Sequence, residues 1–246
     1  MMLIVEELSK QYSTKISALD QVSFEVSRGS FTAILGMSGA GKTTLMRCIL
    51  QLLRPSGGEV WFQGIRLTGC SRQELQQARR HIAAIAQQFN LVRRRSAIEN
   101  CLGGRLPELP LWRCWLGQFP QPLLEEALSA LERVNLLDVA FQRADQLSGG
   151  QQQRVAIARA LTQRATLILA DEPVASLDPH TAHTVLSLLR SLCEEEGLTV
   201  ICNLHQVELA KTYSDRILGL SHGKLVLDQP TNEFDQTSFN QIYLAP

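Results

Sequence analysis

The sequence predicts an α/β fold with a mainly parallel sheet covered by helices on both faces. Apolar β-type runs such as "TLILAD" and "LTVICNLH" alternate with segments of helical spacing such as "PHTAHTVLSLLRSLCEEE". Such alternation is typical of parallel strands joined by crossover helices. The chain has 246 residues, of which 45% are hydrophobic, so it is long and apolar enough to bury a sizeable core.

The N-terminal third begins with strands. "LIVEELSKQY" and "ALDQVSFEVSRG" are short strands separated by turns, and they predict an antiparallel β subdomain. "SFTAILG" is an apolar strand that ends at a glycine loop, and "KTTLMRCILQLL" then has helical spacing. "SRQELQQARRHIAAIAQ" predicts a capped helix that leads into a further strand. Near the C-terminus, "DRILGLSHGKLVLDQ" predicts a hairpin.

Residues 88–146 interrupt the alternation with two apparent helices around an irregular stretch rich in Pro, Gly and Trp. We therefore expect one domain, 1–246, in which residues 1–87 and 147–246 form the core and 88–146 form a helical subdomain. Trp112 and Trp115 lie three residues apart in this insert. We expect them to pack in its core, with a docking surface for a partner as the alternative.

Composition excludes several classes of protein. Lys plus Arg equals Asp plus Glu at 24 each, so a general nucleic-acid field is absent and no nucleic-acid partner is expected. The six cysteines include no C-x-x-C pair, which predicts buried, reduced thiols. The N-terminus lacks a signal pattern, and no apolar stretch approaches the roughly 20 residues that span a bilayer. Any membrane role is expected to depend on a partner.

"GMSGAGKT" matches the phosphate-loop pattern G-x-x-x-x-G-K-[ST] between an apolar strand and a helix. Glycines let backbone N–H groups turn inward around phosphate oxygens, Lys42 supplies a mobile charge, and the Thr43 hydroxyl can ligate Mg²⁺. The motif predicts a P-loop NTPase core. The expected nucleotide-binding residues are Gly36, Met37, Ser38, Gly39, Ala40, Gly41, Lys42, Thr43 and Thr44.

"LILADEP" supplies two acids at the end of a buried strand. Asp171 can hold Mg²⁺ through its water shell, and Glu172 can polarise an attacking water. Beside a phosphate loop, this pair is more than a solvated strand end.

"DQLSGGQQQRVAIARAL" contains a second helix start. Ser148 has the properties of an N-cap, and the free N–H groups and positive dipole of such a helix end favour phosphate. The chain thus has two candidate phosphate sites more than a hundred residues apart.

Three motifs follow the phosphate loop in a fixed order. "LSGGQ" stands at residues 147–151, "ASLD" at 175–178, and His205 lies in "NLHQ". Together these motifs resemble the ATP-binding cassette family, in which "LSGGQ" is the diagnostic signature. The resemblance covers nearly the whole chain and implies binding and hydrolysis of ATP with Mg²⁺.

The resemblance also implies roles for single residues. Tyr12 in "LSKQY" matches the aromatic residue that stacks on adenine, and His205 would hold the γ-phosphate and the attacking water. Gln87 in "AIAQQFNLV" matches the glutamine that contacts Mg²⁺ and this water. Gln88 is the rival, and the spacing to "FNL" favours Gln87.

Members of the family pack head to tail, so the resemblance implies a homodimer with two composite ATP sites. Asp178 would lie at that interface. Each phosphate loop would face the signature of the other subunit, namely Leu147, Ser148, Gly149, Gly150 and Gln151.

"FNLVRRRSAIENCLGGRLPELPLWRCWLGQFP" resembles ATPase subunits of phosphonate importers, and phosphite and hypophosphite importers look much alike. This implies a peripheral protein on the cytoplasmic face of the membrane that drives a transmembrane permease fed by a substrate-binding protein. The alternative is a soluble accessory ATPase of a carbon–phosphorus lyase assembly. Residues 93–95 are three arginines, whereas relatives usually have Gly directly after "LV". We expect either a solvated run of charges or a contact with the permease, with equal weight.

Overall fold

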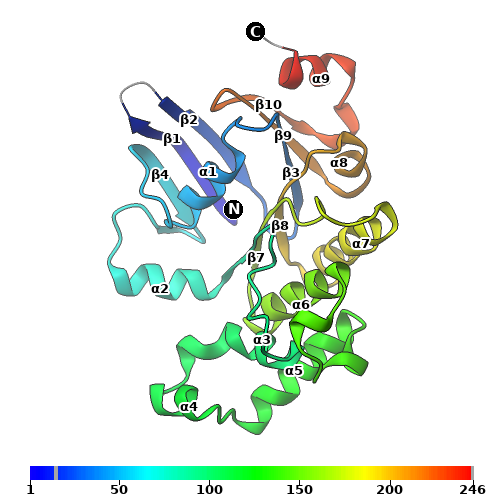
Figure 1. The fold of residues 1–246 in the computed structure, drawn as a ribbon. Coiled ribbons are helices and arrows are strands. Elements are labelled where there is room, and N and C mark those ends of the chain that lie inside the picture. The colour runs from blue at the N-terminus through cyan, green and yellow to red at the C-terminus, as the bar shows by residue number, and fades with distance from the viewer. Residues whose placement is uncertain (14–15, 245–246) are drawn as a thin grey trace.

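The computed structural model describes residues 1–13 and 16–244, which form two sheets and the helices around them (Figure 1). The smaller sheet is antiparallel and has the order β2-β1-β4-β5. Its strands are β1 (Leu3–Ser13), β2 (Ile16–Val26), β4 (Gly57–Phe62) and β5 (Ile65–Arg66). The predicted N-terminal antiparallel subdomain is confirmed.

The larger sheet is mainly parallel, as predicted, and has the order β10-β9-β3-β8-β7-β6. All neighbours pair in parallel except β9 and β10, which form the predicted hairpin. The strands are β3 (Phe31–Leu35), β6 (Ile82–Ile85), β7 (Leu167–Asp171), β8 (Thr199–Asn203), β9 (Arg216–Ser221) and β10 (Lys224–Pro230).

Both faces of this sheet are buried, because each face packs against its own core. Alternate residues of a strand point to opposite faces and so belong to different cores. In β3, Phe31, Ala33 and Leu35 face one core and Ile34 faces the other. The first core contains α6 (Gly149–Thr162), α7 (Pro179–Glu196), α8 (Val207–Tyr213) and part of α9 (Gln236–Tyr243). The second core lies between the two sheets and is filled by α1 (Lys42–Ile49).

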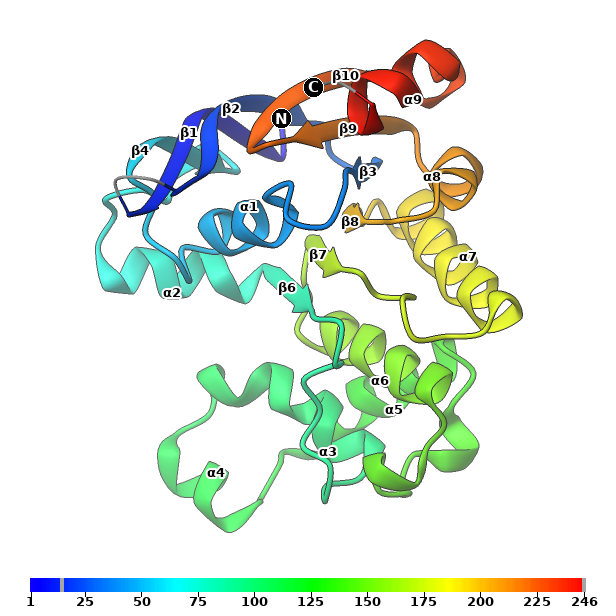
Figure 2. The same ribbon diagram turned by 45° about the horizontal axis from the view of Figure 1, so that its top comes forward.

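Residues 88–146 are mainly helical and lie at the end of the molecule remote from the smaller sheet (Figures 1 and 2). Helices α3 and α5 pack on α6 and share its core. The elements are α3 (Ala97–Leu102), α4 (Leu111–Leu116), α5 (Gln121–Arg133) and the 3₁₀ turns η1 (Gly103–Glu108), η2 (Leu137–Val139) and η3 (Ala144–Gln146). Helix α2 (Arg72–Arg80) precedes β6, and the turn η4 (Thr231–Glu233) precedes α9.

The prediction that Trp112 and Trp115 pack in the core of the insert is wrong. Their exposed fractions are 55% and 92%. Helix α4 has only six residues, so it can bury only one narrow face. The half-buried Cys114 occupies that face, where its thiol donates to the carbonyl oxygens of Leu106 in η1 and of Leu109 just after η1. Four exposed side chains form what we call the tryptophan ridge: Leu111, Trp112, Trp115 and Leu116.

The cysteines are all free thiols, and four of the six are buried. Cys70 and Cys114 are only half-buried, so the prediction holds for the other four. Burial raises the pKa of Cys101 and of Cys193 to about 12, which keeps these thiols protonated at neutral pH. Within residues 1–13 and 16–244, none of the helices combines the length and the apolar character needed to span a bilayer.

Candidate nucleotide-binding site

The phosphate loop connects the buried strand β3 to α1, where the sequence predicts it. Gly36 and Gly41 have φ angles of 157° and 106°. A Cβ atom would lie 2.3 Å from the Leu220 carbonyl oxygen at Gly36 and 2.5 Å from the Ala18 carbonyl oxygen at Gly41. Only glycine tolerates both a positive φ and so close a carbonyl oxygen, which explains why the motif has glycine at these two positions. The loop borders a cavity of about 220 Å³ that Lys42, Thr43 and Glu172 also line.

Lys42 is 5% exposed and lies across its own loop. Its Nζ donates to the carbonyl oxygens of Gly36 and Met37 at 2.7 and 3.1 Å. Burial lowers the pKa of Lys42, and the charges of Glu172 and Asp171 oppose this shift. Neutral carbonyl oxygens therefore hold the ammonium group at the cavity. Charged phosphate oxygens are stronger acceptors and can take their place.

Tyr12 lies beside Thr44, one of the residues that line this cavity. Its ring is 54% exposed, and its hydroxyl is 3.4 Å from the Thr44 hydroxyl. The Lys10 ammonium group is 5.6 Å from the ring centroid. An exposed ring beside the phosphate loop is accessible to a flat aromatic partner, so stacking on adenine stays a prediction.

Two predicted magnesium ligands, Thr43 and Asp171, meet at the end of β7. The Thr43 hydroxyl donates to Asp171 Oδ1 at 3.2 Å. Mg²⁺ usually binds through one or two protein oxygens and completes its shell with phosphate and water, so this pair fits the ion. Among the residues that the structure describes, no cluster of three or more His, Cys, Asp or Glu side chains competes for a metal.

Glu172 and His205 form a direct pair. His205 Nε2 lies 2.5 Å from Glu172 Oε1. Glu172 has φ of 54°, the left-handed conformation that a non-glycine residue rarely adopts. Such strain is found at functional sites, where the surrounding structure enforces it.

Gln87 follows the edge strand β6, whose last residue, Ile85, pairs with Ala170 of β7. Gln87 therefore leaves the sheet at the edge where Asp171 ends its strand. Both Gln87 and Gln88 are exposed, so exposure does not separate them.

The turn after Gln87 is held from α6. Phe89 and Asn90 both have left-handed φ angles, and their carbonyl oxygens accept hydrogen bonds from the Arg159 guanidinium at 3.2 and 2.7 Å. Burial lowers the pKa of Arg159. This half-buried cation thus fixes the shape of the turn that carries Gln87.

The signature starts α6 as predicted. Ser148 is the N-cap: its Oγ accepts from the Gln151 N–H at 3.3 Å, and the Gln151 side chain accepts from the Ser148 N–H at 2.8 Å. None of the five signature residues lines the phosphate-loop cavity. Gly149 and Gly150 adjoin the start of α7 instead, since Cβ atoms there would lie 3.2 Å from Leu177 and 2.2 Å from Thr181.

Asp178 is exposed and is the N-cap of α7. Its Oδ1 accepts from the Thr181 N–H at 3.0 Å, and hydrogen bonds from Thr181 lower the pKa of this carboxyl. The signature and Asp178 thus lie on one surface, at the adjacent starts of α6 and α7.

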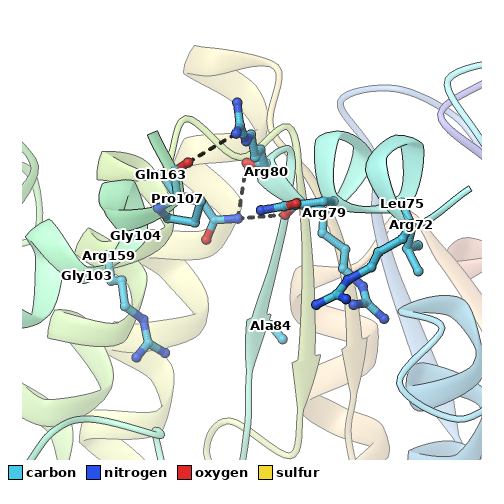
Figure 3. A pocket seen from close by; sticks show the side chains of 11 residues that line it. Arg72, Leu75, Arg79, Arg80, Ala84, Gly103, Gly104, Pro107, Arg159 and Gln163 are labelled. Atoms are coloured by element: carbon cyan, nitrogen blue, oxygen red, sulfur yellow. Dashed lines mark hydrogen bonds between the residues drawn. The ribbon is translucent and has the colours of Figure 1, made fainter. Parts of the chain in front are cut away.

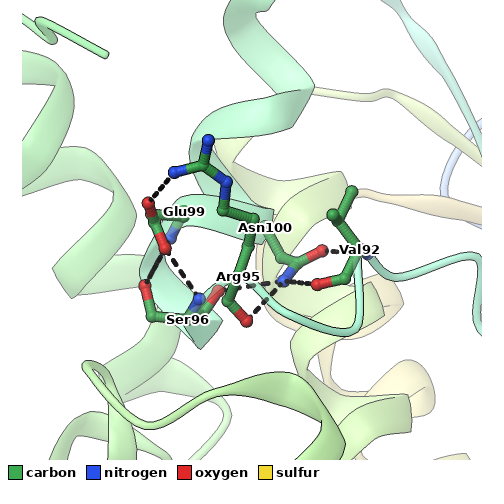
Figure 4. A network of polar contacts seen from close by, with 5 residues as sticks. All are labelled: Val92, Arg95, Ser96, Glu99 and Asn100. Atoms are coloured by element: carbon green, nitrogen blue, oxygen red, sulfur yellow. Dashed lines mark hydrogen bonds and ion pairs between the residues drawn. The ribbon is translucent and has the colours of Figure 1, made fainter.

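The arginine run lies in a loop fixed by its neighbours (Figure 4). Asn100, which is 4% exposed, accepts from the Val92 N–H at 2.7 Å and donates to the Ser96 oxygen at 2.9 Å. Arg95 pairs with Glu99 at 2.7 Å, so one of the three arginines has a role within the chain. Arg93 and Arg94 are exposed, so their side chains are accessible both to solvent and to a contact with the permease.

The structure thus brings Tyr12, the phosphate loop, Asp171, Glu172 and His205 together and places the signature and Asp178 elsewhere. Sequence reasoning missed one polar residue of the site, Asn203, which donates to Asp171 at 2.6 Å. The single amide at the end of the apolar run "TVICN" was the available signal.

Comparison with known proteins gives a consistent result. The family model described as ABC transporter matches residues 19–175. The chain is 47% identical over 242 residues to "Phosphonates import ATP-binding protein PhnC 2" of Synechococcus sp., a match that covers 98% of this chain and 90% of that protein. It is 47% identical over 238 residues to "Phosphonates import ATP-binding protein PhnC" of Staphylococcus epidermidis, a match that covers 97% of this chain and 93% of that protein.

Solved structures agree with the fold. A dimeric ATP-binding cassette in a post-hydrolysis state with ADP and Pi has a TM-score of 0.82 and 34% identity, and covers 95% of this chain and 100% of that one. The cbiO1 protein of Clostridium perfringens, part of an ABC transporter complex, has a TM-score of 0.84 and 28% identity, and covers 97% and 92%. With a family match over more than half of its length and relatives close to half identical, the chain belongs to the ABC transporter family.

Proposed function

We propose that the chain is the ATP-hydrolysing subunit of an importer for phosphonates or related phosphorus compounds. Two copies would bind two ATP molecules head to tail and drive a separate membrane permease fed by a substrate-binding protein. The subunit would act peripherally, on the cytoplasmic face of the membrane.

The observation that carries this proposal is the division of the site. Lys42, Thr43 and Glu172 line the phosphate-loop cavity, and Asp171 and His205 contact Thr43 and Glu172. The exposed N-terminus of α6 lies on a separate surface with Asp178. A helix N-terminus with free N–H groups favours phosphate. A second copy related by a two-fold axis would bring this surface to the phosphate loop, as a self-complementary interface does.

Each residue would then have a distinct task. Lys42 would exchange its carbonyl acceptors for phosphate oxygens, while Thr43 and Asp171 would hold magnesium, which neutralises phosphate charge. Glu172 would accept a proton from the attacking water, and His205, already in contact with Glu172, would orient that carboxylate and the water. Gln87 would contact this water from the turn beyond β6.

The phosphonate assignment rests on the relatives. Both curated relatives described above are named for phosphonate import. Their names favour transport over an accessory role in a carbon–phosphorus lyase assembly. The decisive experiment is ATP-dependent uptake by the chain reconstituted with its permease and binding protein, with methylphosphonate and phosphite as competitors. Strong ATPase activity that no permease stimulates would contradict the transport assignment.

We propose that the permease docks in a groove between α2 and the helical segment, whose lining residues Figure 3 shows. Its volume is about 570 Å³, and α2, η1 and α6 contribute lining residues. None of its lining residues is acidic, and its four arginines form no ion pairs with described residues. We call it the arginine groove, after Arg72, Arg79, Arg80 and Arg159.

Unpaired cations favour an acidic partner segment. The tryptophan ridge follows η1 directly in the chain, and η1 lines the groove with Gly103, Gly104 and Pro107. A segment in the groove would also contact Arg159. The guanidinium of Arg159 holds the turn at Phe89 and Asn90, which directly follows Gln87 and Gln88. Docking would thus act on the position of Gln87.

Charge reversal tests this docking. Arg72→Glu should weaken co-purification with the permease and leave basal ATPase activity unchanged, because Arg72 is exposed and does not line the phosphate-loop cavity. Arg28→Glu, an equal charge change at an exposed residue outside the groove, is the matched control. Equal permease binding by both variants would rule out the arginine groove as the docking site.

A further inference from the structure

Asn203 is a buried amide at the centre of the larger sheet. It ends β8, it is fully buried, and it pairs in register with Asp171 of β7 on one side and with Ile34 of β3 on the other. The preceding residues of β8 are buried as well, and the strand reads "TVICN". An amide in such a place is unfavourable unless hydrogen bonds satisfy it.

Only one half of this amide is satisfied. Asn203 Nδ2 donates to Asp171 Oδ1 at 2.6 Å, whereas Asn203 Oδ1 is buried and has no donor among the described residues. Rotation of the amide by half a turn would set its oxygen against the carboxylate oxygen, so the observed orientation is the favourable one. A leucine of similar size would avoid the unpaired oxygen, so stability alone does not account for an asparagine here.

The hydrogen bond acts on the proposed magnesium residue. Asp171 Oδ1 accepts from Asn203 Nδ2 and also from the Thr43 hydroxyl. Asp171 Oδ2 receives no hydrogen bond within the described part of the chain, so it is the oxygen that stays available. Thr43 is itself a proposed metal ligand, so its hydroxyl would bind the ion. Asn203 is then the donor to Asp171 that would not contact the metal.

We propose that Asn203 is a positioning residue that orients the Asp171 carboxylate for magnesium, an inference that rests on the proposed ATPase function. The amide fixes Oδ1 and leaves Oδ2 free to accept from the water shell of the ion. Outer partners that orient a metal-binding carboxylate contribute to metal affinity without touching the metal.

The test compares Asn203→Leu with Thr199→Val. The second change also replaces a buried polar residue of β8 by an apolar one of similar size, but at the other end of the strand, where Thr199 accepts from the Gly29 N–H. Mn²⁺ binding to the ADP complex is measured by electron paramagnetic resonance, and ADP affinity is measured separately in EDTA. Asn203→Leu should weaken Mn²⁺ binding by about 10-fold or more and change metal-free ADP affinity by less than about twofold. Thr199→Val should change neither.

A double-mutant cycle makes the assignment specific. In an Asp171→Asn background, Asn203→Leu should cause no further loss of Mn²⁺ affinity, because its effect passes through the carboxylate. If Asn203→Leu fails to fold, Asn203→Ser carries the same expectation. Unchanged Mn²⁺ binding in the folded variant, or an equal loss of ADP affinity in EDTA, would overturn the proposal. A wild-type chain that binds no adenine nucleotide would instead overturn the ATPase function.

Discussion

At the scale of single residues, the site is defined by contacts among the chain's own side chains and backbone. Glu172 is held in a left-handed conformation against His205, and Lys42 is buried against carbonyl oxygens of its own loop. A cation and a carboxylate thus line the cavity that a phosphate would occupy. Preorganised charge of this kind is a large part of catalysis in phosphoryl transfer.

Replacement of Glu172 by Gln is the direct test of the proposed base. The amide keeps the size of the side chain but cannot accept the proton, so turnover should fall by about 10²–10⁴-fold while ATP binding persists. ATPase assays and equilibrium binding of radiolabelled ATP measure the two effects. The variant should also accumulate as an ATP-bound dimer on size-exclusion chromatography. An ATP-loaded monomer would contradict the head-to-tail arrangement.

At the scale of elements, the starts of α6 and α7 carry both structural and proposed binding roles. Ser148 and Asp178 cap the two helices, and Gly150 brings the helices into close contact at Thr181. We therefore expect a substitution here to have two effects, on folding and on nucleotide hydrolysis. Suitable pairs of variants can separate them.

Ser148→Ala and Ser148→Gly form one such pair. Alanine at an N-cap is expected to lower the free energy of unfolding by about 1 kcal/mol, while glycine lowers it by only a few tenths. Both changes remove the hydroxyl that the second subunit would offer to ATP, so both should reduce hydrolysis and leave ATP binding to the monomer nearly intact. Thermal unfolding and ATPase activity measure these outcomes. Full activity of the glycine variant would mean that the hydroxyl only caps the helix.

Gly150→Ala tests the contact between α6 and α7. The added Cβ would lie 2.2 Å from Thr181 Cγ2, so the helices must move apart, at a cost of about 1–3 kcal/mol in the free energy of unfolding. A second change, Thr181→Ser, removes that methyl group and should restore much of the loss. Gly103→Ala is the matched control, because nothing lies within 4 Å of the added atom. Denaturant unfolding measures all three, and an equal loss at Gly103 would contradict the steric explanation.

At the scale of the whole molecule, the fold separates the proposed tasks. The larger sheet carries the phosphate loop and the acids, and the helical segment carries the tryptophan ridge. The arginine groove is lined by α2, η1 and α6. Arg159 of α6 joins these regions through the turn after Gln87. A permease in the groove would therefore have a short physical route to the site of hydrolysis.

Much of this architecture was predictable because it depends on local patterns. The alternation of strands and helices, the bounds 149–162 of α6 and the cap at Ser148 all follow from periodicity and capping chemistry. The amide at the end of "TVICN" marks Asn203 as unusual, but its contact with Asp171 was not predictable, because Asp171 lies on another strand, 32 residues away. The exposure of Trp112 and Trp115 also depends on tertiary packing, since a helix of six residues has no periodicity that separates a buried face from an exposed one.

The separation of the phosphate loop from the N-terminus of α6 has a kinetic consequence. If each active site needs two subunits, hydrolysis in dilute solution is second order in protein, and specific activity should rise in proportion to concentration until dimers predominate. A dilution series of the free chain measures this. Subunits not gathered on a permease would then hydrolyse almost no ATP, so idle copies in the cell would consume little of its nucleotide pool.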